Sequence, residues 1–354
     1  MLDYIIVGLG LSGLAISEEL DRRSKDFVVF EDNSQSSSYV AGGIFNPVIL
    51  KRFTPAWNAA EQMKVAIPFY KALEKKLGVE IIYNWNIYRR FHSFEEQNDW
   101  FIASDNPKLS AFLDPELKKN TNSNLIAEYS LGKVLNTGYI DTEKLLDNYR
   151  GHIEQQGRLK LEKFEYADLK VYSDHFEYNG ISSKNIIFCE GFGLKKNPFF
   201  NYLPLRGNKG EYIVIHAPDL KLDFAVKSSV FLIPLGNDYY KAGATYDHQD
   251  KTAEPTEKAK NKLISALKEL IKCDFEVVDQ IAGIRPAVSD RRPLVGSHPE
   301  LDNIYCCNGF GSRGVLISPN ISRMLIGHIE DGDALDSEVN LERFTKKHYK
   351  LVNS

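Results

Sequence analysis

The chain has 354 residues, of which 43% are hydrophobic and 26% are charged, and its formal net charge is −4. This length predicts two domains, or one domain with a large insertion, because it is long for one hydrophobic core. The negative net charge and the dispersed basic residues argue against DNA or other nucleic acid as an obligatory partner. No apolar stretch reaches the about 18 residues of a membrane span, and the start of the chain lacks a signal-peptide pattern. We therefore expect a cytoplasmic protein without a membrane span.

Cysteine and histidine spacing predicts neither disulfides nor a metal site. The chain has four cysteines without a C-x-x-C pair, and its eight histidines show no spacing typical of metal ligands. Cys306 and Cys307 are adjacent in a strand-like run, so their side chains should lie on opposite faces of a sheet. We expect all four cysteines to be reduced and no metal to be bound.

The first 31 residues predict a dinucleotide site. An apolar run over residues 4–7 is followed by Gly8, Gly10 and Gly13 in G-x-G-x-x-G spacing, and then by a segment with helical character. Such glycines allow a tight turn, close approach of the backbone to a pyrophosphate, and packing of the helix on the strand. A second apolar run ends at Glu31, where a carboxylate can accept hydrogen bonds from ribose hydroxyls. The alternative, a glycine-rich turn without a ligand, explains Glu31 poorly.

A polar loop and a long helix are predicted next. Thr54 is expected to cap the helix, with Pro55 at its first position and Gly78 at its end. Pro68 should kink this helix or split it in two.

The central part of the chain mixes strands and helices. We expect a strand over residues 80–91, a short helix over 94–104, and a loop with an amphipathic helix over 137–157. Residues 160–179 alternate polar and apolar side chains as a hairpin would. A buried strand should follow and end at Cys189, before Gly191.

The second half of the chain changes character. Residues 210–218, 230–247 and 274–288 predict antiparallel strands, interrupted by a helix whose apolar face comprises Leu263, Ala266, Leu267, Leu270 and Ile271. Residues 303–329 return to strand, glycine-rich loop and helix. This alternation predicts a discontinuous nucleotide-binding domain from residues 1–83, 136–202 and 281–354, and a β-rich substrate domain from residues 84–135 and 203–280.

Eight motifs, in one order, resemble the FAD-dependent D-amino-acid oxidase superfamily, which includes glycine oxidase and sarcosine oxidase. They are VGLGLSGLA with Glu31, YVAGGIFNP, TGYID, IIFCEGFG, LPLRGNKGEYIVI, IPLGNDYYKAGAT, IAGIRPAVSDRRPLVG and NGFGSRGVLISP. The resemblance implies an α/β fold, namely a glutathione-reductase-like FAD-binding Rossmann domain with an inserted antiparallel β-sheet substrate domain. It favours FAD over NAD, because a simple NAD-binding domain would be one continuous block.

The resemblance also implies which residues bind the cofactor. FAD should be non-covalent, because no linking cysteine stands near residues 289–293. The residues expected to bind it are Gly8, Gly10, Leu11, Ser12, Gly13, Glu31, Asp32, Ala41, Gly42, Gly43, Ile44, Asn46, Phe164, Gly191, Gly309, Gly311, Ser312, Arg313, Gly314 and Val315. Glu190 departs from the family pattern, which has alanine there, and is expected to point away from the pyrophosphate.

The C-terminal glycine-rich loop is expected to touch the flavin. N–H donors and a helix N-terminus there would stabilise negative charge near N1 and the C2 carbonyl of the flavin. Two helix starts are open, either near Gly314, as in the family, or with Ser318 as cap and Pro319 as first residue. A helix-initiating loop with a surface Arg313 is the alternative to a cofactor loop.

Arg285, in the AGIRP motif, is the main substrate-side candidate. Its guanidinium matches a carboxylate with two parallel hydrogen bonds, and family arginines of this motif bind the substrate carboxylate. A structural salt bridge is the alternative. The other residues that could line the pocket are Lys51, Arg52, Tyr246, His248 and Arg313.

The function that the resemblance implies is oxidation of the C–N bond of an amino acid or secondary amine, by hydride transfer to flavin N5. The imine product is hydrolysed by water, no acid–base residue of the protein is required, and oxygen or an unknown carrier reoxidises the flavin. Two alternatives stay open. The GSRG loop resembles the oxidase domain of the bifunctional enzyme that modifies the tRNA wobble uridine, although the negative charge argues against tRNA. The other is a non-catalytic FAD-binding redox partner.

Overall fold

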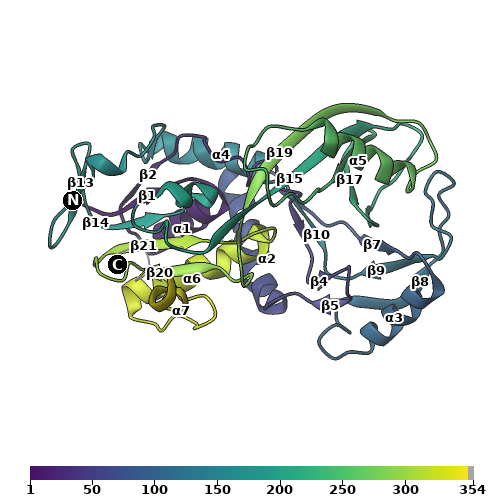
Figure 1. The fold of residues 1–354 in the computed structure, drawn as a ribbon, viewed down its shortest axis with the longest axis horizontal. Helices are drawn as coiled ribbons and strands as arrows, with labels where there is room; N and C mark the ends of the chain where they lie inside the picture. The colour runs from purple at the N-terminus through teal and green to yellow at the C-terminus, as the bar shows by residue number, and fades with distance from the viewer. Residues whose placement is uncertain (350–354) are drawn as a thin grey trace.

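The computed structural model describes residues 1–349, which form two parts side by side (Figure 1). The first part contains an eight-stranded sheet whose central path runs β11-β2-β1-β14-β13-β12, with β21 paired to β14 and β20 to β21. Its strands are β1 (Leu2–Val7), β2 (Phe27–Phe30), β11 (Leu159–Lys160), β12 (Lys170–Val171), β13 (Phe176–Tyr178), β14 (Ile181–Phe188), β20 (Leu294–Ser297) and β21 (Ile304–Asn308).

This sheet is parallel at its centre and buried on both faces. Strands β2, β1, β14 and β21 pair in parallel, which suits their near-continuous apolar sequences. One face packs against four helices, which are α1 (Leu11–Arg22), α2 (Ala59–Leu77), α4 (Thr142–Gln155) and α6 (Gly314–Asp331). Cys307 faces these helices and Cys306 faces the opposite core, so the prediction of opposite faces is confirmed. All four cysteines are unpaired.

The second part is built on another eight-stranded sheet, in the order β19-β15-β18-β17-β16-β7-β9-β8. All its neighbours pair antiparallel except β7 and β16. The strands are β7 (Ile87–Arg90), β8 (Leu113–Lys118), β9 (Leu131–Val134), β15 (Leu205–His216), β16 (Ala225–Lys227), β17 (Phe231–Gly236), β18 (Tyr239–Gly243) and β19 (Glu276–Val288). This is the antiparallel substrate-domain sheet that the sequence predicts.

Smaller elements complete the fold. Helix α3 (Phe94–Ser104) packs on β8, and α5 (Glu257–Lys268) packs on β15 and β18. The remaining elements are β3 (Ile44–Phe45), β4 (Val48–Ile49), β5 (Thr54–Pro55), β6 (Ile82–Tyr83), β10 (Gly138–Ile140), α7 (Glu342–Phe344), the short helices at Tyr166–Asp168 and Gly191–Lys196, and a π-helical turn at Thr345–Tyr349. None of the helices within residues 1–349 is long and apolar enough to cross a membrane.

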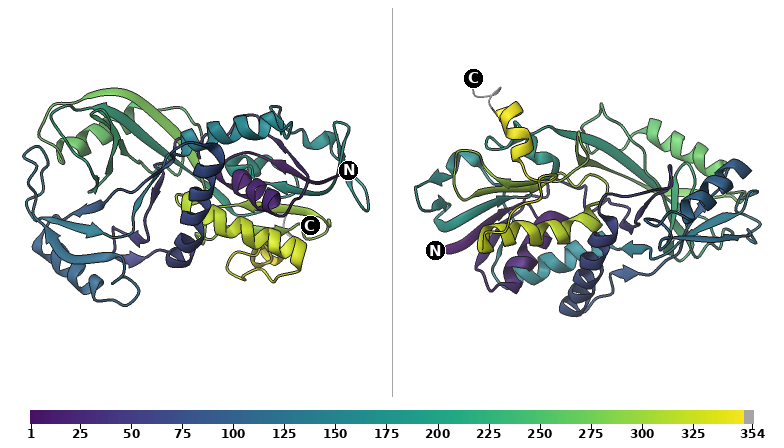
Figure 2. Two further views of the ribbon diagram at one scale, coloured as in Figure 1. Left: turned by 180° about the vertical axis from the view of Figure 1, so that it is seen from behind. Right: turned by 90° about the horizontal axis from the view of Figure 1, so that it is seen from below.

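Two long strands connect the parts. Strands β15 and β19 pair along their whole lengths, from Leu205 with Val288 to His216 with Glu276, and they extend from one part of the molecule toward the other (Figures 1 and 2). The predicted domain boundary at residue 281 falls within β19. The strand pairing therefore gives no natural break at that position, and the domain limits stay a prediction.

The predicted start of the long helix is wrong. Helix α2 begins at Ala59 after Asn58, whereas Thr54 and Pro55 form strand β5, paired with β4. Thr54 and Pro55, which suggested a helix start, instead lie in a short edge strand, where proline is also tolerated. Gly78 ends the helix in the left-handed conformation, as expected. Pro68 lies inside one continuous helix, so the helix is not split.

Other elements follow the predictions more closely. Helices α3 and α4 are confirmed, and α6 begins at Gly314 and contains Pro319, so the family-like start is correct. The strand expected over residues 80–91 is broken into β6 and β7. Of the hairpin expected over 160–179, only β12 and β13 pair with each other, whereas β11 pairs in parallel with β2.

Candidate functional site

The glycine turn between β1 and α1 forms a cradle with no room for side chains. Gly8 has φ of +96°, and a Cβ on it would lie 2.8 Å from the carbonyl oxygen of Cys189. A Cβ on Gly13 would overlap the carbonyl oxygen of Gly8. The first turn of α1 has no side-chain cap at Gly10, although the Leu11 N–H donates to Ser38 Oγ over 3.1 Å. Open N–H groups at a helix N-terminus suit a phosphate.

Glu31 lies beside this turn, where the sequence places it. It is buried, and its carboxylate accepts hydrogen bonds from the backbone N–H groups of Leu9 and, over 2.7 Å, of Asn33. A guanidinium nitrogen of Arg150 lies 3.7 Å away. A carboxylate offers about four acceptor positions, so capacity for ribose hydroxyls remains. Asp32 instead accepts from the N–H of Ser34.

The segment at residues 41–46 is held between the two parts. A Cβ on Gly42 would lie 2.9 Å from the Tyr212 hydroxyl, and a Cβ on Gly43 would overlap the carbonyl oxygen of Ile140. From β18, Lys241 Nζ donates to the Ala41 carbonyl oxygen over 3.2 Å. Because Gly42 and Gly43 lack side chains, this segment can pack closely against Tyr212 and Ile140.

Lys241 and Tyr212 are contacts that the sequence analysis did not identify. Lys241 is buried, its ammonium lies 5.5 Å from the Tyr212 ring centre, and burial lowers its pKa. Burial raises the pKa of Tyr212, and the neighbouring Arg285 opposes this rise. The position of Lys241 inside the apolar run YYKAGA could have indicated a buried lysine with a specific contact.

A second open helix N-terminus lies at the C-terminal loop. Gly311 has φ of +57° and nothing within 4 Å of its Cβ direction, and α6 begins without a side-chain cap at Arg313. Asn308 connects this loop to the turn that follows β14, because its amide donates to the Gly191 carbonyl oxygen over 2.9 Å. Gly191 has φ of +54°, with only Ser37 Oγ at 4.0 Å. The remaining residues expected to bind the cofactor here are Gly309, Ser312, Gly314 and Val315, which the same loop and helix start carry.

Four of the residues expected to bind the cofactor already make other contacts or belong to a strand. Ser12 Oγ donates to the Cys307 carbonyl oxygen over 2.7 Å, and Ile44 belongs to β3. Asn46 accepts from the Val48 N–H over 2.8 Å with its side chain. The Phe164 ring is buried and stacks on Tyr178 at 4.1 Å, so only its backbone is free to meet an adenine.

Glu190 turns toward protein donors beside the glycine turn. Its carboxylate accepts hydrogen bonds from the Tyr166 hydroxyl and, over 2.7 Å, from the Asn197 amide. Burial raises the pKa of Glu190 from 4.5 to about 7, with Asp32 adding to the rise and the two hydrogen bonds opposing it. The carboxyl group is therefore half protonated near neutral pH.

Glu190 should make stability depend on pH. Because its pKa is higher in the folded state, the stability it contributes is present below pH 4.5 and is lost as pH rises through about 7. We expect Glu190→Gln to reduce the fall in unfolding free energy between about pH 5 and about pH 8, by up to about 3 kcal/mol. Chemical denaturation of the holoprotein at each pH measures the unfolding free energy. Glu165→Gln, at an exposed neighbour, is the control, and parallel curves for Glu190→Gln and wild type would contradict the prediction.

Arg285 lies on β19 over Gly210 of the neighbouring strand. A Cβ on Gly210 would overlap its guanidinium. The guanidinium donates to the Thr245 carbonyl oxygen over 3.3 Å and lies 4.7 Å from the Tyr246 ring centre. Among residues 1–349, no carboxylate forms an ion pair with Arg285. The interpretation as a structural salt bridge therefore finds no partner in the described chain.

Arg313 approaches the same place from the other part. Its guanidinium donates to the Asn46 carbonyl oxygen over 3.0 Å, and burial lowers its pKa to about 10. Tyr246 is close enough to oppose that fall. The structure thus brings Arg285, Tyr246 and Arg313 together. Arg313 is half-buried, not a surface side chain.

The other predicted pocket residues lie further out. Lys51 and Arg52 are exposed in the turn between β4 and β5. His248 is also exposed, with Nε2 at 3.5 Å from the Asn208 amide nitrogen. No contact between these three and Arg285 is found in the part of the chain that the structure describes.

These features fit a dinucleotide with its pyrophosphate over α1 and its ring near the 41–46 segment, because α1 and α6 begin without a side-chain cap and the backbone at Gly191 and Gly311 is open. The family model described as DAO, FAD dependent oxidoreductase, matches residues 3–327. The chain belongs to the FAD-dependent oxidoreductase family. Its cofactor is therefore FAD, and the predictions of family and fold class are confirmed.

Known relatives of this oxidoreductase include amine-oxidising proteins. It is 21% identical to glycine oxidase from Pseudomonas aeruginosa, over 91% of this chain and 93% of the relative. It is 25% identical to the tRNA 5-methylaminomethyl-2-thiouridine biosynthesis bifunctional protein MnmC from Campylobacter jejuni, over 82% of this chain but only 45% of that protein. A crystal structure of glycine oxidase from Geobacillus kaustophilus has a TM-score of 0.79 at 19% identity, covering 94% of this chain and 95% of the other.

Proposed function

We propose that this oxidoreductase oxidises the C–N bond of a small amino acid or secondary amine that carries a carboxylate. The observation that carries the proposal is Arg285, a half-buried guanidinium that contacts the Thr245 carbonyl oxygen, the Tyr246 ring and the Tyr212 hydroxyl but forms no ion pair with a carboxylate within residues 1–349. A guanidinium with free donors in this setting favours a carboxylate ligand. The similarity to glycine oxidases supports the same substrate class.

The residues of this chain bind and orient the substrate. Arg285 holds the carboxylate, and the Tyr246 ring lies over the guanidinium at 4.7 Å. Arg313 places a second positive charge beside Tyr246. Bound non-covalently, FAD would supply the hydride acceptor for oxidation of the carbon that bears the amine. The substrate amine must be neutral, and positioning supplies most of the rate, so no protein base is required.

An anaerobic reduction screen tests this function. The purified holoprotein is mixed with glycine, sarcosine, proline, and D- and L-amino acids in turn, and loss of the oxidised flavin absorbance is followed. We expect reduction by one group of carboxylate-bearing amines, and no reduction by the corresponding amines without a carboxylate, such as methylamine. Bound FAD that none of these compounds reduces would contradict the proposal and favour the non-catalytic redox partner.

A tRNA-linked substrate is the second candidate. The GSRG loop and the similarity to the bifunctional tRNA-modifying protein favour it, since Arg285 would also suit a carboxymethyl group on a secondary amine. The chain spans about half the length of that relative. Reduction by tRNA with a carboxymethylaminomethyl uridine, but by no free amino acid, would establish this candidate.

The acceptor and the compartment are also proposed. Hydrogen peroxide formed under air would identify oxygen as the acceptor, whereas turnover only with an added dye would indicate a carrier. Four unpaired cysteines suit the cytoplasm.

A further inference from the structure

Lys209 is a fully buried lysine on β15, outside the contacts described so far. Its side chain has no exposed area, and its ammonium group donates hydrogen bonds to three acceptors. A buried charge is costly unless it is paired and hydrogen-bonded. The acceptors around Lys209 therefore indicate what this charge is used for.

All the hydrogen bonds of the Lys209 ammonium go to one segment, residues 245–256, which we name the β18–α5 segment. Nζ donates to Asp250 Oδ2 over 2.6 Å, to Thr252 Oγ1 over 3.4 Å, and to the Glu254 carbonyl oxygen. The Lys209 hydrogen bond lowers the pKa of Asp250. One ammonium thus binds three residues of a chain segment that has no regular structure of its own around them.

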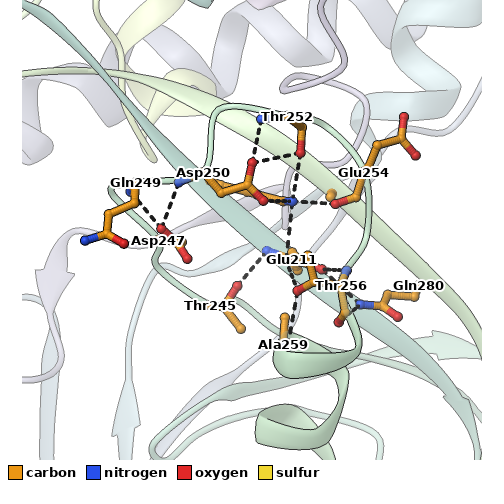
Figure 3. Close-up of polar contacts among 12 residues, drawn as sticks. Glu211, Thr245, Asp247, Gln249, Asp250, Thr252, Glu254, Thr256, Ala259 and Gln280 are labelled. Atoms are coloured by element: carbon orange, nitrogen blue, oxygen red, sulfur yellow. Dashed lines mark hydrogen bonds and ion pairs between the residues drawn. The ribbon is translucent and has the colours of Figure 1, made fainter.

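The neighbouring residues fix both ends of this segment to β15. The backbone groups of Lys209 exchange two hydrogen bonds with Asp247, of 2.8 and 2.9 Å. Glu211 accepts from the N–H and hydroxyl of Thr256, over 2.7 and 2.8 Å, and Thr256 caps α5. Figure 3 shows the hydrogen bonds between Glu211 and Thr256 and those between Asp250 and Thr252. Lys209 therefore fixes the middle of a segment whose two ends are already attached.

The opposite face of the same strand carries the candidate substrate site. Side chains alternate along a strand, so Lys209 and its neighbour Gly210 face opposite sides, and Arg285 lies over Gly210. The β18–α5 segment provides two groups that contact Arg285. They are the Thr245 carbonyl oxygen, at 3.3 Å, and the Tyr246 ring, at 4.7 Å.

We propose that Lys209 is a positioning residue for carboxylate binding. By holding the β18–α5 segment against β15, it sets Thr245 and Tyr246 where they fix the Arg285 guanidinium. The Tyr246 ring is 62% exposed, so its position depends on the backbone at Thr245 and Asp247, which is hydrogen-bonded to β15. This inference rests on the proposed function, because Arg285 must bind a carboxylate for its position to matter.

Lys209→Met removes the charge and keeps most of the stem. Asp250→Asn is the milder variant, since the amide has nearly the shape of the carboxylate but removes its ion pair with Lys209. The matched control is Lys221→Met, which removes an exposed ion pair with Asp238 in the same part of the molecule. All are compared as holoproteins.

Two measurements are made on each variant. Hydrogen–deuterium exchange of the β18–α5 segment reports whether Lys209 holds it, and acetate titration of the flavin absorbance reports whether carboxylate binding depends on it. We expect faster exchange and an about tenfold weaker acetate Kd for Lys209→Met, a smaller change for Asp250→Asn, and none for Lys221→Met. For an amine that the wild-type enzyme oxidises, we expect Lys209→Met to raise KM about tenfold while kcat stays within about threefold of wild type.

Tyr246→Ala separates positioning from a general loss of stability. If Lys209 acts through this segment, the double variant Lys209→Met with Tyr246→Ala should bind acetate no more weakly than Tyr246→Ala alone. Additive losses, unchanged exchange, or unchanged acetate binding in Lys209→Met would each overturn the proposal. A wild-type protein that neither binds acetate nor oxidises an amine would instead contradict the proposed function, and the exchange data would still decide whether Lys209 holds the segment.

Discussion

Replacing Arg285 with alanine is expected to lower kcat/KM for a carboxylate-bearing amine by about a thousandfold. Removing one partner of a buried, hydrogen-bonded charge pair costs about 2–5 kcal/mol, and about 4 kcal/mol corresponds to this factor. Arg285 is half-buried under Tyr246, and no carboxylate within residues 1–349 neutralises it, so the substrate is its expected ion partner. Steady-state kinetics with the best amine from the reduction screen measures the loss.

Arg285→Lys distinguishes charge from geometry. Lysine keeps the positive charge but cannot offer two parallel N–H donors, so we expect an intermediate loss, of about ten- to a hundredfold. Most of the loss should be in KM, because the carboxylate is bound in both the ground state and the transition state. A loss confined to kcat would indicate a different role for Arg285.

Arg206→Ala is the matched control. Arg206 lies on β15 in the same sheet and is exposed. It should leave the kinetics unchanged. If Arg285→Ala retains wild-type kinetics, or if the control loses as much activity, carboxylate binding by Arg285 is contradicted.

Local patterns predicted the parts of the site that depend on local geometry. The strand, glycine turn and helix around Gly8 and Gly13 form within one short segment, so spacing alone was sufficient. The same holds for the start of α6 at Gly314. Thr54 and Pro55 misled the prediction, because residues that suit a helix start also suit a short edge strand.

Contacts between distant segments could not be predicted from such patterns. Lys241 reaches Ala41 over 200 positions in the sequence, and Arg313 reaches Asn46 over 267. Lys209 lies in a strand whose pattern looks like that of its neighbours. Only the return of the β18–α5 segment over β15 makes it a buried, multiply bonded charge. Sheet order decides these contacts, and sheet order is not a local property.

Gly13→Ala is expected to yield a protein that retains less than about a tenth of the FAD bound by wild type. The new Cβ would overlap the carbonyl oxygen of Gly8, which is a backbone atom and cannot rotate away. Helix α1 must then move off the strand, and its N-terminal N–H groups move away from the pyrophosphate position. The ratio of flavin to protein absorbance in the purified variant measures this loss.

Gly151→Ala is the matched control for that loss. Gly151 lies within α4 with nothing near its Cβ direction, so alanine should leave FAD binding unchanged and raise stability by about 0.5–1 kcal/mol. Gly10→Ala gives a graded test that does not depend on whether Gly13→Ala folds. Its Cβ would meet the Ser38 hydroxyl at 2.8 Å, a side chain that can rotate away, so FAD should bind more weakly without being lost. Full FAD content in a folded Gly13→Ala protein would mean that the turn after β1 does not hold the cofactor, because no phosphate could then depend on the close packing of α1 against Gly8.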